Sequence, residues 1–181
     1  MSDTTANPFE HILYEMKMYL YSQLKLIPDT FPNKRVIENM FVDSRAIHLR
    51  NLADFFEDKV MNKSKLWHFS DFVNDVNVVY TIKKPLFVTI KDFTSKATCH
   101  LSNQRLEEEF KDETLECVKN ALPEMIKAIR SFFKALDDHV KEKYKCYWEN
   151  EDIQEYATEI RKLLPVFEVH CGQELSYATT E

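Results

Sequence analysis

The stretch Phe41-Val-Asp-Ser-Arg-Ala-Ile-His-Leu-Arg-Asn-Leu-Ala-Asp-Phe-Phe-Glu57 has the apolar spacing of an amphipathic helix, but polar residues interrupt its apolar face. A helix advances about 100° per residue, so Leu52 and Phe55 lie within roughly 40° of His48. His48 is therefore expected to point into the protein. The polar residues expected to flank it, at roughly 40 to 60°, are Ser44, Arg45 and Asn51.

The rest of the chain also predicts helices. Gly172 is the single glycine in 181 residues, which disfavours phosphate loops, dinucleotide folds and most β-rich architectures. Apolar residues recur at helical spacing in five ranges: 8–27, 33–61, 85–101, 112–140 and 150–164. Pro165 is expected to end the last of these helices. Residues 66–84 are interpreted as a loop, with a short strand over 76–82 as the alternative. We predict an all-α, single-domain bundle of four or five helices over about residues 8–165, with 1–7 and 166–181 peripheral.

Composition indicates which partners and which cellular location to expect. The net charge of −6 argues against broad attraction to nucleic acid, so DNA is not expected as a partner. The longest apolar runs fall short of the ~20 residues that a membrane span needs, and the amino-terminal residues lack a signal-peptide pattern. We therefore expect a cytoplasmic protein without membrane attachment. Its four cysteines are widely spaced and are interpreted as reduced thiols.

A second histidine is also expected on the apolar face of a predicted helix. His100 lies on the apolar side of the predicted helix 85–101, with Lys96 roughly 40° away. His48 and His100 could face each other across one cavity and form a ligand-binding or chemical site. The alternative is that each imidazole bonds a core hydroxyl or carbonyl and fixes helix register. Lys96 could supply a cation to an anionic ligand or extend to water.

Two further arrangements follow from spacing. Arg45 lies one heptad from Glu38, so an ion pair between them is favoured. No Glu-x-x-His pair of the di-iron type is present. A looser metal site could take one histidine from each of three helices, namely His48, His100 and His139. No motif for a cofactor is found, and none is predicted.

Two segments, Ser44-Arg-Ala-Ile-His-Leu-Arg-Asn-Leu-Ala-Asp-Phe-Phe56 and Ser95-Lys-Ala-Thr-Cys-His-Leu-Ser-Asn-Gln-Arg105, resemble small prokaryotic helical proteins of the HEPN superfamily. The resemblance covers about residues 8–145. It implies a dimer-forming bundle of the kind common in toxin–antitoxin and other defence systems. Many relatives are metal-independent ribonucleases with a motif in which four to six residues separate an arginine from the histidine that follows it. Here Arg45 stands three positions before His48, and Lys134 takes the motif position before His139, so the motif is not intact.

Two function hypotheses follow. The first is a HEPN-like binding protein, acting as a homodimer on an antitoxin-like protein partner or on RNA. The second is a metal-independent RNA endonuclease. In it His100 would act as acid or base, and Arg45, His48 and Lys96 would assist. A metal or small-ligand pocket in the bundle core is the remaining alternative.

Overall fold

The computed structural model describes residues 7–24, 34–58, 67–99 and 108–172. The all-α prediction is confirmed: the described residues form α-helices and two 3₁₀ turns, and no strand is assigned among them. The helices are α1 (Pro8–Gln23), α2 (Lys34–Phe55), α3 (Lys84–Cys99), α4 (Glu108–His139), α5 (Glu142–Trp148) and α6 (Glu151–Gly172).

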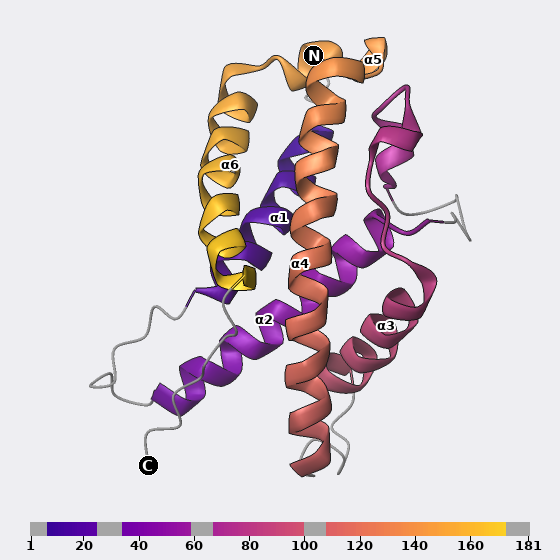
Figure 1. Cartoon of the computed structure of the whole chain (residues 1–181). Coiled ribbons are helices and arrows are strands. Elements are labelled where there is room, and N and C mark those ends of the chain that lie inside the picture. Colours follow the sequence, from indigo (N-terminus) through magenta and orange to yellow (C-terminus); the bar gives the residue numbers. More distant parts are fainter. Residues whose placement is uncertain (1–6, 25–33, 59–66, 100–107, 173–181) are drawn as a thin grey trace.

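Five of the helices pack in a closed ring. Helix α1 packs against α2 and α6, α2 packs against α3, and α4 completes the ring by packing against both α3 and α6. Figure 1 shows α4 running the length of the molecule while α2 crosses it on a diagonal. The short α5 lies at one end, beside α1 and α6.

An aromatic cluster fills the centre of the ring. The ring of Phe132 on α4 lies 5.1 Å from that of Phe55, the last residue of α2, and 5.8 Å from that of Phe56, which directly follows α2. Phe72, from the connection between α2 and α3, lies 6.4 Å from Phe132. All four side chains are buried. Aromatic pairs at these separations add to the stabilisation that burial provides.

Polar contacts hold the described part of the connection from α2 to α3. It contains two 3₁₀ turns, Phe69–Asp71 and Val76–Val78, and the second lies in the range 76–82 where a short strand was the alternative to a loop. Backbone nitrogen of Ser70 donates to Nδ1 of His68, which leaves Nε2 of this buried ring to donate to the carbonyl of Glu57, 2.8 Å away. Lys141 Nζ donates to the Ser70 carbonyl.

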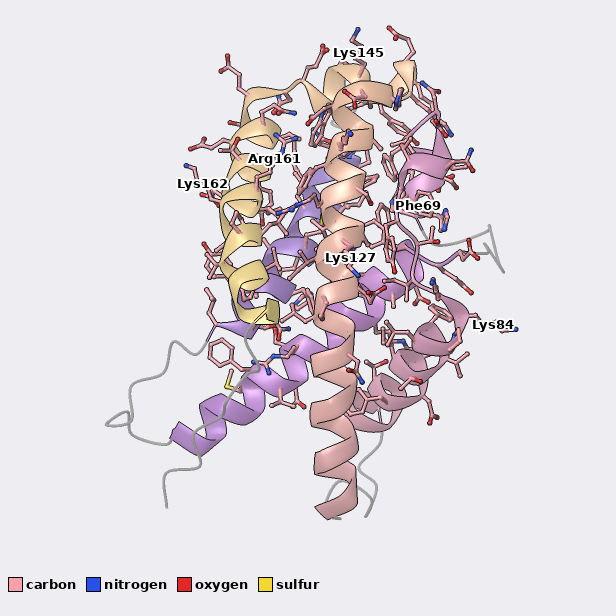
Figure 2. All side chains as sticks on the ribbon, in the orientation of Figure 1. Phe69, Lys84, Lys127, Lys145, Arg161 and Lys162 are labelled. Carbon is pink, nitrogen blue, oxygen red and sulfur yellow. The ribbon has the colours of Figure 1, made fainter. Side chains whose placement is uncertain are left out.

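Farther along, the same connection is held by α4. The backbone nitrogen of Tyr80 donates to the Ser131 hydroxyl, 2.7 Å away, and the Tyr80 hydroxyl donates to Glu124. The Lys127 ammonium lies 5.7 Å from the Tyr80 ring. Figure 2 labels Lys127 on the exposed side of α4. The described residues 67–83 of the connection are therefore held against the bundle at more than one point.

One boundary prediction was wrong. Helix α6 continues through Pro165 to Gly172. The proline is exposed, so water can replace the missing hydrogen bond, while buried Leu164 and Phe167 hold the adjacent turns. Pro123 likewise lies inside a helix, α4.

Two other details concern the ends of α5 and α6. Helix α5 lies in a segment to which no helix was assigned. Asn150 caps the amino-terminal end of α6, because its Oδ1 accepts from the Ile153 nitrogen at 3.3 Å. Figure 2 shows Arg161 of α6 directed toward α4, where it donates to both carboxylate oxygens of Asp137 at 2.8 Å and lies over the Phe133 ring.

We expect Phe132→Ala to lower the free energy of unfolding by about 3–5 kcal/mol, because it removes a ring that α2 and the α2–α3 connection both contact. The matched control is Val88→Ala on the exposed face of α3, which should change the free energy by less than about 0.5 kcal/mol. Urea unfolding followed by circular dichroism measures both. Equal effects of the two substitutions would contradict the packing described.

Candidate functional site

A buried carboxylate and a buried imidazole join α1 to α2. Nδ1 of His48 lies 2.7 Å from Oε2 of Glu15, and the two residues are 8% and 7% exposed. Asn51 Nδ2 donates to the same oxygen at 3.0 Å. The prediction that His48 points inward is confirmed. Its partner, however, is a carboxylate, whereas the sequence-based alternative was a hydroxyl or carbonyl.

The surroundings of Glu15 keep its carboxylate charged. Burial acts to raise the pKa of Glu15, but hydrogen bonds from His48 and Asn51, together with the charges of His48 and His11, outweigh it and hold the pKa below its ordinary value of 4.5. His11 Nε2 lies 3.8 Å from Oε1 of Glu15, on the exposed side of α1. The carboxylate is therefore bonded on its buried side and approaches solvent on the other.

Beside this pair lies a cavity of about 330 Å³. Residues from α1, α2 and the connection after α2 line it: His11, Ile12, Glu15, Asn51, Leu52, Asp54, Phe55 and Trp67. Its volume is at the low end of the range for small-ligand pockets. The lining combines two carboxylates with an imidazole, an amide and two aromatic rings.

Contacts with α3 and with the aromatic cluster hold Asp54 and Trp67 at the cavity. Lys91 Nζ lies 2.6 and 2.8 Å from the two carboxylate oxygens of Asp54. Trp67 packs its ring 5.3 Å from Phe72 and remains 46% exposed. An indole held by core rings but open to solvent is a common anchor in recognition sites.

Arg45 does not line this cavity. Its Nε donates to the carbonyl of Ser22 at 2.9 Å, and one terminal nitrogen donates to the same oxygen. Arg45 thus binds a carbonyl at the end of α1, which otherwise lacks a partner within the helix. The predicted partner, Glu38, has a side chain outside the described part of the structure, so that ion pair stays a prediction.

The other predicted site residues are distributed as follows. His100 lies outside the described residues, and Lys96 belongs to α3 but its side chain is not described. The shared cavity of His48 and His100 therefore stays a prediction. His139 is exposed at the end of α4, whereas His48 is buried between α1 and α2. Within the described ranges, no group of three or more His, Cys, Asp or Glu side chains is placed to hold a metal ion.

Sequence reasoning missed Glu15, His11, Asp54 and Trp67. A signal for Glu15 was present, because it lies between Ile12 and Tyr19 on the face that packs against the bundle. A carboxylate at such a position needs a hydrogen-bond donor on a neighbouring helix. Pairing it with the inward histidine of the next helix would have located the site.

Two more cavities open near α6. One, of about 290 Å³, lies between α1 and α6 and includes Glu155 in its lining. The other, of about 420 Å³, lies at the junction of α4, α5 and α6. Both are rich in carboxylates that face water, and neither contains a buried polar pair like Glu15 and His48.

Comparison with known protein families, with curated proteins and with solved structures gives no match for this chain. Among the helices in the described ranges, none has the length and apolar character needed to cross a membrane.

The carboxyl of Glu15 should titrate below 4.5, and Asn51→Ala should move its pKa upward by removing one hydrogen bond to the charged form. A pKa depressed by folding stabilises the protein above the ordinary value, and this stabilisation is lost as the pH falls through the folded-state pKa. Carbon-detected NMR titration of wild type and variant measures the pKa. Titration of wild-type Glu15 at or above 4.5 would contradict the geometry.

Proposed function

We propose that this chain is a binding protein and that the α1–α2 cavity is where a protein partner docks. The observation that carries the proposal is the composition of the lining: two carboxylates beside a Trp67 indole that is half in solvent. Residues around the cavity are also held rigidly, by the Glu15–His48 pair on one side and by Asp54–Lys91 on the other. Rigid aromatic anchors with a polar rim are typical of protein interfaces.

The same lining disfavours chemistry on RNA. It contains no arginine or lysine to hold a phosphate and no serine, threonine or cysteine to act as a nucleophile. His48 does form a carboxylate–imidazole pair of the kind that orients a general base. The ring is nevertheless buried and is not part of the cavity lining. The geometry therefore favours a positioning role for His48 over a catalytic one.

The resemblance to HEPN-type bundles supplies the class of partner for this proposal. Proteins of that kind form dimers and bind antitoxin-like proteins, so a second copy of this chain and a separate protein are both candidate partners. In such a setting the protein would act in a prokaryotic defence system. RNA is the less favoured partner because the cavity lining carries no lysine or arginine.

Site-specific photocrosslinking tests the binding role. A photoreactive phenylalanine analogue placed at Tyr14 or Trp67 should capture a protein in the cells that encode this chain, because both side chains are exposed beside the cavity. The same analogue at Val166, exposed on α6, is the control and should capture nothing above background. Mass spectrometry of the crosslinked species distinguishes a second copy from a different protein. Equal capture at all three positions, or capture at none, would contradict the proposal.

Incubation with mixed RNA in EDTA tests the ribonuclease hypothesis. We expect the purified chain and its His48→Gln and His100→Ala variants to leave the RNA intact, because the cavity lacks phosphate-binding cations. Gel electrophoresis of the RNA gives the answer. Cleavage by the wild type that either histidine substitution abolishes would replace the binding proposal with a catalytic one.

A further inference from the structure

We infer that the α1–α2 cavity binds an arginine or lysine side chain presented by an amphipathic helix of the partner. This inference rests on the proposed function and names the chemistry of the partner segment. The helix would lie along an exposed ridge of α2, which we define as Met40, Ile47 and Asn51, and would place its cation between Glu15 and Asp54.

The charges of the cavity favour a cation. Glu15 and Asp54 each place a carboxyl group in the cavity lining, and the lining contains no lysine or arginine. Lys91 offsets part of the charge of Asp54 from the α3 side, and His11 lies 3.8 Å from Glu15. The chain as a whole carries a net charge of −6. An incoming cation would therefore be attracted over a distance and then held by two carboxylates.

The aromatic rings of the cavity suit the same ligand. Trp67 and Phe55 both line it, and Trp67 presents an exposed indole. A guanidinium or ammonium group that lies on an aromatic face gains a cation–π interaction, which is strongest with tryptophan. The volume of about 330 Å³ fits one long side chain better than a larger organic ligand.

The ridge explains why a helix would present the cation. Met40 and Ile47 are 64% and 46% exposed and are one heptad apart, so they lie on the same face of α2. Asn51 follows on the next turn and lines the cavity. Exposed apolar side chains at this spacing are a surface on which a second helix packs, and methionine adapts well to such contacts.

Charge also favours a separate protein over a second copy of this chain as the partner. A second copy of this chain carries the same net charge of −6 and the same acidic cavity, so it is a poor complement to this surface. A separate protein with a basic amphipathic helix satisfies both the ridge and the cavity.

The test uses a labelled helical peptide with leucines on one face and arginines and lysines on the other, and a twin peptide with glutamate at every basic position. Fluorescence anisotropy at low salt should show the basic peptide binding the full chain at least about tenfold more tightly than its twin. Asp54→Asn and Glu15→Gln should each weaken that binding about tenfold. The control Glu155→Gln, which removes a carboxylate from the α1–α6 cavity, should leave it unchanged.

Several results would overturn the inference. They are equal affinity for the two peptides, unchanged affinity in Asp54→Asn, and equal weakening by Glu155→Gln. Circular dichroism confirms that each variant is folded; if Glu15→Gln unfolds the chain, Asp54→Asn carries the test. Crosslinking from Tyr14 or Trp67 to a protein whose captured segment is not basic would refute this inference and leave the binding role intact. Absence of any crosslink would refute the binding role instead.

Discussion

The hydrogen bond between Glu15 and His48 is the constraint on which the candidate site depends. A carboxylate with 7% of its surface exposed loses most of its hydration, so it stays charged only if donors replace the water. His48 and Asn51 supply those donors from α2. Because both donors belong to one helix and the acceptor to another, the interaction fixes the register of α1 against α2. That register places His11, Asn51 and Glu15 around one cavity.

Other parts of the bundle hold the remaining residues of the cavity in place. The connection after α2 carries Trp67 to the cavity, and it is held in place by the His68 bond to the Glu57 carbonyl and by Lys141. Helix α3 contributes Lys91, which orients Asp54. Three segments therefore line the cavity and α3 orients one of its carboxylates, so its polar groups are positioned before any partner arrives. Preorganisation of this kind reduces the entropy lost on binding.

The sequence predicted the parts of the structure that local patterns determine. Near absence of glycine and a helical apolar period predicted an all-α bundle, and the period also placed His48 on a buried face. Tertiary contacts determine the rest. The bond from Arg45 to the Ser22 carbonyl depends on where α1 ends against α2. The run of α6 through Pro165 depends on burial of Leu164 and Phe167, which overrides the local effect of proline.

The partner of His48 could be predicted from the sequence only in part. Glu15 occupied an apolar face, which is a visible anomaly, but its pairing required knowing which helices are neighbours. The side chains of His100 and Lys96 lie outside the described part of the structure. The carboxylates of Glu15 and Asp54 and the indole of Trp67 are the groups that the structure places around the cavity.

A double-mutant cycle of Glu15→Gln and His48→Gln measures the central interaction most directly. Urea unfolding of the wild type, the two single variants and the double variant near pH 7 gives the coupling free energy. We expect a favourable coupling of about 1–3 kcal/mol, because each single variant leaves a buried polar group without its hydrogen-bond partner. Additive effects, with coupling below about 0.3 kcal/mol, would show that the two side chains do not hold α1 and α2 together.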